Sequence, residues 1–329
     1  MKRREFLKNI ELVGIGCVAG GLLAPVITSC GGGGGGGVST QEQASATTSQ
    51  LRMPEPPFKY VELDPAEVAS LAYRSHYANK KINNDTLKGC AYGTFNAIIT
   101  ALAQKVGFPY TLIPTALMNY GRGGVLSWAT LCGALNGTFA AVQLISPKPE
   151  DIIESLNWWY STTSLPTYVP TSDDVNAVIN QLKAAGKSDD EIKAYQTAVQ
   201  RLSTQANKSV SNSPICHISV AEWLYANVDS NNVPLWGADS AEREERCARL
   251  VASTAAKAVE FLNQQIVYKN FKKLPTTSSA VQSCLGCHGK VGNPEAPEEL
   301  KRDDTRMQKG VTCTNCHSTI DPNTHPFGG

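Results

Sequence analysis

Two short motifs near the C-terminal end of the chain combine cysteine and histidine at a fixed spacing. Cys284–His288 and Cys313–His317 each read C-x-x-C-H, which is the attachment signature of c-type haem. In this motif the two thiols form thioethers with the porphyrin, and the histidine binds the iron as its proximal ligand. Pairs of C-x-x-C also bind zinc, but zinc does not require a histidine directly after the second cysteine in both copies. The sequence therefore predicts two haems c, with thioethers to Cys284, Cys287, Cys313 and Cys316 and with the proximal ligands His288 and His317.

The segment that carries both motifs, residues 276–329, is poor in large apolar side chains. A segment of this composition buries too little apolar surface to offset the conformational entropy that it loses on folding. Two covalently bound porphyrins would supply the missing apolar core. We therefore expect a small, irregular C-terminal diheme segment that is unfolded without its cofactors.

The remaining histidines are candidates for the distal side of the two irons. The chain has five histidines, and three of them, His76, His217 and His325, lie outside the haem motifs. His217 directly follows a cysteine and fits another site better, whereas His325 lies on a proline-containing tail close behind the second motif. We predict His76 and His325 as distal ligands. The softer alternatives are methionines: Met53, Met118 and Met307.

The number of axial ligands decides the class of function. Two axial nitrogens saturate a haem iron and leave no position for a substrate. Three spare histidines for two haems favour such closed sites, so we expect an electron carrier rather than a catalyst. The alternative is a haem enzyme that reduces a small oxidant, such as nitrite, at an open sixth position.

Four further cysteines lie in the middle of the chain, outside the haem motifs: Cys90, Cys132, Cys216 and Cys247. An even set of four thiols in an exported protein is consistent with two disulfides. Four thiolates also hold an iron–sulfur cluster. With disulfides, the middle of the chain would be a stapled anchor for the haem segment; with a cluster, it would be a second redox centre.

Residues 1–29 have the organisation of an export signal. A basic start with the adjacent Arg3 and Arg4 precedes the apolar stretch Leu12–Ile27, which is short for a membrane span. The arginine pair indicates the twin-arginine route. Because this route carries folded proteins, it favours a cluster that is assembled before export.

Ile27–Cys30 resembles a lipobox, so we predict lipidation at Cys30; the alternative is an ordinary signal peptide in which this cysteine is incidental. Residues 30–57 begin with seven consecutive glycines after the cysteine and are expected to form a flexible tether. We therefore expect an exported protein on the periplasmic side, held to the membrane by a lipid anchor. The formal net charge of +1 gives no indication of a nucleic-acid partner.

Residues 58–275 have the apolar periodicity of helices and no convincing strand. Asp64 and Pro65 have the residue types of an N-cap and a first helical residue, and this helix should end near His76. A second helix is expected from about Asp85 to Val106, with one apolar face. Further helices are predicted over Val125–Ile145, rich in small residues, over a polar, solvent-facing hairpin at about 172–207, and over Ser240–Ile266.

Four segments of this body resemble the split-Soret cytochrome c family: Lys88–Phe95, Gly121–Gly137, Cys216–His217 and Arg246–Leu250. Together with the two haem motifs, the likeness spans about residues 60–329. It implies a mainly α fold, in which a helical body, residues 58–275, carries an iron–sulfur cluster of the 2Fe–2S type. It also implies a homodimer with two haems stacked at one end of each subunit and with haem ligands partly shared across the dimer. The cluster ligands that it implies are Cys90, Cys132, Cys216 and Cys247.

The body also resembles a wider family of redox-active cysteine proteins. In that family another cysteine commonly precedes the glycine-rich turn, where this chain has Ala116, Leu117 and Met118. A fifth thiol is therefore missing, which argues against dithiol exchange as the activity of this chain.

Overall fold

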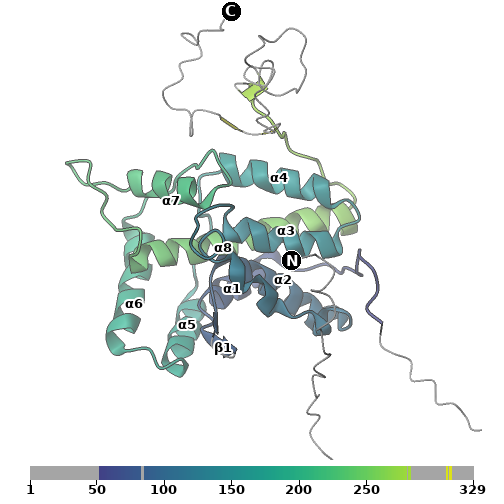
Figure 1. The fold of residues 1–329 in the computed structure, drawn as a ribbon, viewed down its shortest axis with the longest axis horizontal. Helices are drawn as coiled ribbons and strands as arrows, with labels where there is room; N and C mark the ends of the chain where they lie inside the picture. Colours follow the sequence, from purple (N-terminus) through teal and green to yellow (C-terminus); the bar gives the residue numbers. More distant parts are fainter. Residues whose placement is uncertain (1–51, 83–84, 280, 283–308, 310, 313–329) are drawn as a thin grey trace, which may run out of the picture. The chain divides into compact units, whose positions relative to one another are not determined.

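The computed structural model describes residues 52–82, 85–279, 281–282, 309 and 311–312. They belong to one of the two compact units of the chain, Arg52–Gly329. Their secondary structure is mainly helical, as the sequence predicts (Figure 1). In chain order the elements are α1 (Pro65–His76), β1 (Lys80–Ile82), β2 (Asp85–Leu87), α2 (Cys90–Val106), the 3₁₀ helices η1 (Tyr110–Leu112) and η2 (Thr115–Gly121), α3 (Gly133–Ile145), α4 (Pro149–Thr162), α5 (Ser172–Ala184), α6 (Asp189–Thr204), α7 (Cys216–Tyr225), α8 (Ala241–Leu262) and the π-helical turn η3 (Asn263–Val267).

Helix α8 is the element around which the others pack. Ser240 caps its N-terminus, where the serine hydroxyl accepts a hydrogen bond from the backbone N–H of Arg243 at 3.1 Å. Helices α1, α2, α3, α4 and α6 all contact α8, which crosses the middle of Figure 1. Most of its residues between Glu245 and Leu262 are buried, whereas a surface helix buries a single stripe. Several polar residues in this part of α8 are therefore held inside the protein, namely Glu245, Arg246, Arg249, Ser253 and Thr254.

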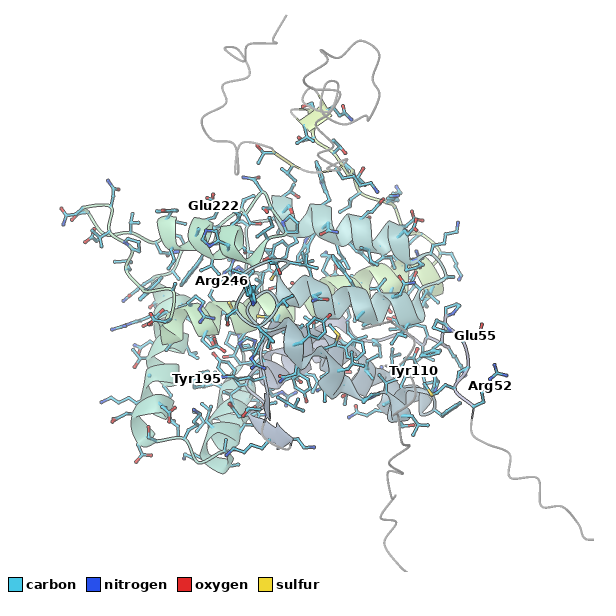
Figure 2. All side chains as sticks on the ribbon, in the orientation of Figure 1. Arg52, Glu55, Tyr110, Tyr195, Glu222 and Arg246 are labelled. Atoms are coloured by element: carbon cyan, nitrogen blue, oxygen red, sulfur yellow. The ribbon has the colours of Figure 1, made fainter. Side chains whose placement is uncertain are left out.

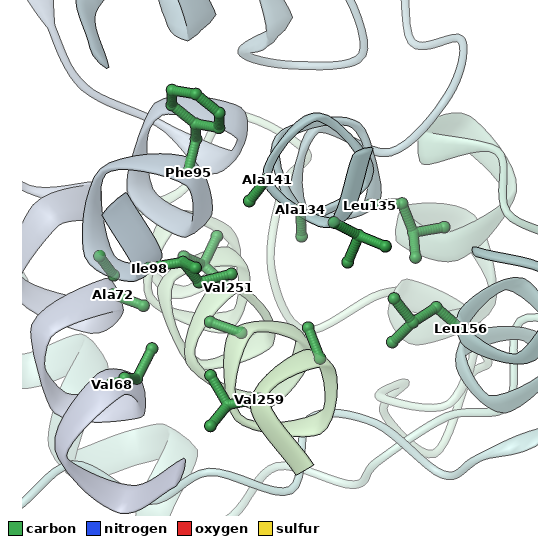
Figure 3. Packing of buried hydrophobic residues seen from close by; sticks show 14 of the residues in the cluster. Val68, Ala72, Phe95, Ile98, Ala134, Leu135, Ala141, Leu156, Val251 and Val259 are labelled. Carbon is green, nitrogen blue, oxygen red and sulfur yellow. The ribbon is translucent and has the colours of Figure 1, made fainter. Parts of the chain in front are cut away.

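The main hydrophobic core lies between α8 and the helices that surround it (Figure 3). Its side chains are mostly aliphatic or aromatic, with Met118 and three cysteines among them, and they are almost wholly excluded from water. Burial of apolar side chains is the dominant favourable contribution to folding. Among the members labelled in Figure 3 are Val68 and Ala72 from α1, Phe95 and Ile98 from α2, Ala134, Leu135 and Ala141 from α3, Leu156 from α4, and Val251 and Val259 from α8.

Helices α2 and α3 approach each other at backbone distance because glycines face the contact. A Cβ atom at Gly137 would lie 2.1 Å from the carbonyl oxygen of Ala91, and one at Gly133 would lie 2.8 Å from the Cβ of Cys90. No side chain fits at these separations. The small residues that the sequence shows in this region therefore serve close packing, as predicted, and they hold the start of α3 against the start of α2.

The start of α1 confirms the sequence prediction. The Asp64 carboxylate accepts a hydrogen bond from Ala66 N at 2.7 Å, and Pro65 is the first helical residue. The second helix, however, begins at Cys90 and not near Asp85, because residues 80–87 form the antiparallel hairpin β1–β2. The expectation of no strand is therefore wrong for this segment. Each strand has only three residues, too few for an alternating pattern to be visible in the sequence.

Helix α3 begins at Gly133, so the prediction of a helix from Val125 is also wrong. Residues 122–130 form an irregular segment, called here the left-handed loop, in which Val125, Leu126 and Ser127 have φ angles of 65°, 48° and 68°. For residues with a Cβ atom this region is uncommon and costs about 1–2 kcal/mol each. Backbone hydrogen bonds within the loop offset part of that strain, among them Ala129 N to Gly123 O at 3.0 Å and Thr130 N to Gly124 O at 3.1 Å.

The hairpin of α5 and α6 is only partly exposed. Both helices begin with a capping box, centred on Thr171 and on Ser188. Their inner faces form a second core cluster with α1 and α8, so the expectation of a solvent-facing hairpin holds for the outer face alone. No helix in the described part of the chain combines the length and apolar character needed to cross a membrane.

Candidate metal centre

Three of the four cysteines in the middle of the chain lie at the starts of helices. Cys90 is the first residue of α2, Cys132 is the N-cap of α3, and Cys216 is the first residue of α7. Cys247 lies in the N-terminal half of the central helix α8. The N-terminus of a helix carries partial positive charge and lowers the cost of ionising a thiol. This partial charge would stabilise metal-bound thiolates at the three positions, whereas burial of the free thiols raises their pKa.

The structure brings these four cysteines together in one place, called here the four-cysteine site. The charges of Cys132, Cys216 and Cys247 all raise the pKa of Cys90, and Cys90 is also hydrogen-bonded to Cys247. All four are free thiols, and all but Cys216, which is half-buried, are buried. Successive cysteines of this site are 42, 84 and 31 positions apart along the chain. The fold thus makes one group of sulfur donors out of residues that are distant in sequence.

A short antiparallel pairing of backbone fixes two of the four cysteines. Cys132 N donates to Pro214 O at 2.9 Å, Cys216 N donates to Thr130 O at 2.6 Å, and Leu131 and Ile215 form an isolated bridge. The left-handed loop leads directly into this pairing. Its conformation therefore determines where Cys132 and Cys216 lie relative to each other.

The thiols of the site are not electrostatically equivalent. The pKa of Cys247 is lowered to about 5, first by the hydrogen bond from Cys90 and then by the charges of Arg246 and Arg243. The pKa of Cys90 is raised by the same hydrogen bond and by burial. Burial raises the pKa of Cys132, which a hydrogen bond with Tyr160 and the charge of Arg246 oppose. Burial also raises the pKa of Cys216. Cys247 is therefore the thiolate around which the others are arranged.

Arg246 provides a test of whether these residues fit an anionic group. Its side chain is 1% exposed and lies in the interior of the helical body (Figure 2). Nη2 donates to the carbonyl and the hydroxyl oxygens of Ser219, at 3.1 and 2.8 Å, while Nε is buried without a hydrogen-bond partner. A buried guanidinium needs an opposing charge, because desolvation of an unpaired ion costs several kcal/mol. Two ferric ions, two sulfides and four thiolates carry net negative charge, so a cluster at the four-cysteine site would supply it.

The spacing of the donors also bears on the kind of metal centre. Within the described residues, no three His, Cys, Asp or Glu side chains are placed to hold a single metal ion. A cluster with bridging sulfides spreads its four ligands more widely than a single ion does. Such a cluster takes four thiolates, the type of donor that this site offers.

His76 lies beside this site and not at a separate position. Its carbonyl accepts a hydrogen bond from Gly89 N at 2.9 Å, because the β1–β2 hairpin folds the chain back on itself. The ring is 2% exposed; Nε2 lies 2.9 Å from Glu244 Oε1, and Nδ1 is buried without a partner. A carboxylate on one ring nitrogen is the common support of a metal-bound histidine. The role of His76 as a distal haem ligand stays a prediction.

The other predicted ligands are distributed as follows. His217 is exposed beside Cys216, and its backbone N–H donates to Ala129 O at 3.1 Å, as expected for a residue at the four-cysteine site. Met118 is 2% exposed in the main core, and Met53 is exposed. Several sequence predictions lie outside the described residues, namely those for Cys30, Cys284, Cys287, His288, Cys313, Cys316, His317 and His325.

Sequence reasoning missed the polar side chains that surround the four-cysteine site. Arg243 forms a hydrogen bond to Cys247 and an ion pair with Glu244 at 3.0 Å. The Tyr160 hydroxyl donates to Ser219 Oγ at 2.8 Å and also contacts Cys132. The sequence did contain one indication of a buried arginine. Arg246 directly precedes a cysteine, and the helix that follows is largely apolar.

Comparison with known proteins agrees with this geometry. A family model described as "Putative redox-active protein (C_GCAxxG_C_C)" matches residues 92–261. The split-Soret cytochrome c of Desulfovibrio desulfuricans (strain ATCC 27774 / DSM 6949 / MB) is 32% identical over 261 residues, which cover 78% of this chain and 76% of that protein. The chain belongs to the split-Soret cytochrome c family.

A solved structure supports the same assignment. The structure that reports a novel iron centre in the split-Soret cytochrome c from Desulfovibrio desulfuricans ATCC 27774 aligns with a TM-score of 0.57 and 31% sequence identity. The alignment covers 82% of this chain and 94% of that chain. Membership of the split-Soret cytochrome c family makes this chain a redox protein. These relatives give no support to the alternative of an enzyme that reduces nitrite.

The residue that follows Cys132 must be glycine in this packing. A Cβ atom at Gly133 would lie 2.5 Å from Gly121 O. The close contact of α3 with η2 and α2 therefore determines the residue type beside one cysteine of the site.

Proposed function

We propose that this protein is an exported electron carrier with two haems c and one iron–sulfur cluster of the 2Fe–2S type. The observation that carries the proposal is the four-cysteine site, in which four free thiols from four helices meet beside a buried arginine without a carboxylate partner. The iron centre reported for the related cytochrome is consistent with it. The cluster would supply one-electron chemistry.

The chain's own residues would have three tasks at this site. Cys90, Cys132, Cys216 and Cys247 would hold the iron as thiolates. The core around α8 excludes water from all but the Cys216 edge, since Cys216 is the one half-buried ligand. The helix N-termini and the two arginines would offset the negative charge. None of these tasks moves a substrate, which agrees with a carrier and not an enzyme.

The haem part of the proposal depends on the two C-x-x-C-H motifs. Cys284, Cys287, Cys313 and Cys316 would hold the porphyrins, with His288 and His317 as proximal ligands. His76 and His325 would be the distal ligands and would close both irons to substrates. We further propose a homodimer on the periplasmic side, anchored through a lipid on Cys30. The residue types in the sequence support these points, and the name of the relative, a cytochrome c, supports the presence of haem.

The test begins with purified, anaerobically handled protein. We expect two haems per chain by mass spectrometry, low-spin ferric haem at low temperature, and non-haem iron with an equal amount of acid-labile sulfide. Replacement of Cys90, Cys132, Cys216 or Cys247 by Ala should each abolish the non-haem iron and leave both haems in place. Thr254→Ser, a buried substitution on α8, is the matched control and should keep the iron. Unchanged non-haem iron in all four cysteine variants would show that the cluster is not at this site.

A further inference from the structure

Arg246 is held rigidly between two helices. It lies on α8 directly before Cys247, and both of its hydrogen bonds go to Ser219 on α7. The hydroxyl of Ser219 also accepts a hydrogen bond from Tyr160 on α4 at 2.8 Å. The guanidinium is therefore fixed by groups from α4 and α7 and cannot turn toward solvent.

The contrast with Arg249, one turn further along α8, shows what Arg246 lacks. Arg249 is also buried, but its Nε donates to Glu245 Oε1 at 2.8 Å, and its Nη2 donates to Val199 O and Ser203 Oγ, both at 3.0 Å. Arg246 forms no ion pair with any carboxylate in the described part of the chain, and its Nε has no partner. Two buried arginines on one helix thus differ in that only Arg249 is paired with a carboxylate, whereas the negative charge that Arg246 meets is that of the cysteines.

What Arg246 faces is the four-cysteine site. Its charge favours the ionised form of three thiols: it helps to lower the pKa of Cys247 and opposes the rise that burial causes in the pKa of Cys132 and Cys216. The neighbouring Arg243 also acts on Cys247, but it is 28% exposed and shares its charge with Glu244. Arg246 is therefore the cation that acts most strongly on the site, because it is buried away from water and shares its charge with no carboxylate.

We propose that Arg246 is a positioning residue that sets the reduction potential of the cluster. The inference rests on the proposed function. On reduction, a donor protein loses one electron and the centre gains it, with no bond formed or broken and no proton taken up. The site then carries one more negative charge. A fixed buried guanidinium stabilises this reduced state more than the oxidised state, since the attraction grows with the charge that it faces. It therefore raises the potential and makes the centre easier to reduce.

The first test compares Arg246→Met with Arg246→Lys in the intact holoprotein. Methionine keeps the length of the side chain without its charge, whereas lysine keeps the charge. A dithionite titration followed by electron paramagnetic resonance should show a lower potential for Arg246→Met. The equilibrium constant for reduction should fall at least tenfold, which is about 59 mV for one electron. Arg246→Lys should retain most of the wild-type potential. Arg201→Met, which removes a half-exposed arginine on α6, is the control and should leave the potential unchanged.

The second test measures stability without the metal. In metal-free protein Arg246 meets only the thiolate of Cys247, whereas the loaded cluster carries two negative charges. Arg246→Met should therefore lower the denaturation midpoint of the metal-free protein less than that of the holoprotein. In the holoprotein the same substitution should accelerate loss of iron to a chelator. Either of two results would overturn the inference alone. The first is a loaded cluster whose potential does not respond to Arg246→Met. The second is a metal-free protein that this variant destabilises as much as it destabilises the holoprotein. Wild-type protein without non-haem iron and sulfide would instead overturn the proposed function on which it rests.

Discussion

Asp174 and Arg246 show in opposite ways how a buried charge is accommodated in this protein. Asp174 is 1% exposed, and its two oxygens accept hydrogen bonds from Ser70, Tyr168 and Thr171 at 2.5–2.9 Å. Arg74 lies 3.6 Å away and adds an opposite charge. The carboxylate is thus satisfied by its own chain, whereas Arg246 is not. This difference is the reason to assign Asp174 to the stability of the fold and Arg246 to the metal centre.

Asp174→Asn should therefore destabilise the fold without affecting the cluster. The amide has one acceptor oxygen where the carboxylate has two, and its NH₂ group faces hydroxyl and N–H donors. We expect a loss of about 2 kcal/mol at pH 7, in line with the cost of leaving buried hydrogen-bonding groups unsatisfied. Denaturant unfolding measures this loss. Asp173→Asn, at the exposed position next to it, is the control and should change stability little.

The same variant should reveal a pH dependence. Burial raises the pKa of Asp174, but the hydrogen bonds from Ser70, Tyr168 and Thr171 outweigh burial and hold the pKa below its usual value. A group with a lowered folded pKa stabilises the protein fully above its unfolded pKa, about 4, and loses that contribution as the pH falls through the folded value. The stability difference between wild type and Asp174→Asn should thus shrink below about pH 4. An equal difference at pH 7 and pH 3 would contradict this assignment.

At the scale of elements, the left-handed loop is the part that positions the site. Gly124 has a φ angle of +64°, and a Cβ atom there would lie 2.7 Å from Thr130 N and 2.8 Å from Ala129 C. Both contacts are backbone atoms, which cannot move aside as a flexible side chain can. The loop can keep its shape only with glycine at this position. Because Thr130 O accepts the hydrogen bond from Cys216 N, a shift of the loop would move a cluster ligand.

Gly124→Ala should destabilise the protein by more than the cost of a positive φ alone. We expect a loss of about 2–4 kcal/mol, with strain contributing about 1 kcal/mol and the backbone clash the rest, together with reduced iron content. Gly186→Ala is the matched control, since Gly186 has a φ of +72° but nothing within 4 Å of a Cβ atom. It should cost about 1 kcal/mol and leave the iron unchanged. Similar losses of stability and iron in the two variants would show that crowding at Gly124 has no role.

Sequence patterns predicted the long helices and failed for the short or locally strained segments. The apolar face of α2 and the cap of α1 are encoded within a few neighbouring residues, so periodicity and residue type are sufficient. The hairpin after α1 is too short for a pattern. The left-handed loop depends on pairing with residues near Pro214, more than eighty positions away, which no local window contains. Apolar side chains such as Val125 and Leu126 therefore suggested a helix that tertiary structure overrides.

The same distinction holds for the candidate site. The four cysteines could be named from the sequence. They are the thiols that remain once the four of the haem motifs and the two within residues 1–30 are set aside, and they form an even set. Their convergence depends on how α2, α3, α7 and α8 pack. The contributions of Arg243, Tyr160 and Ser219 could not be predicted, since a charged or hydroxylated residue in a helix is more often at the surface. The burial of Arg246 is visible only once α7 and α4 are in place.

At the scale of the whole molecule, the helical body has its own hydrophobic core. The members of the main core cluster, with the residues packed against it, lie between Phe58 and Leu274. The described residues beyond this range add only a few contacts, such as the hydrogen bond from Ser278 Oγ to Val311 O at 2.6 Å and an exposed ion pair of Lys309 with Glu154. Exposed ion pairs contribute about 0–1 kcal/mol. The main core and the four cysteines of the proposed cluster thus both belong to the helical body, whereas the haem motifs come later in the sequence.

A chain of residues 52–282 should therefore fold and load its cluster without haem. This end point keeps Val281, which is buried. Circular dichroism should show a helical protein that unfolds cooperatively, with non-haem iron and sulfide and no haem absorbance. Its midpoint should lie within about 4 °C of the transition of the body in the full chain, since about 1 kcal/mol corresponds to 2–4 °C at this size. The Cys90→Ala version of the same chain should stay folded but lose the iron, because metal binding stabilises only the state in which the four ligands meet. A truncated chain that is molten or free of iron would mean that the haem segment is required for the body to form. In that case the two redox centres would fold as one unit.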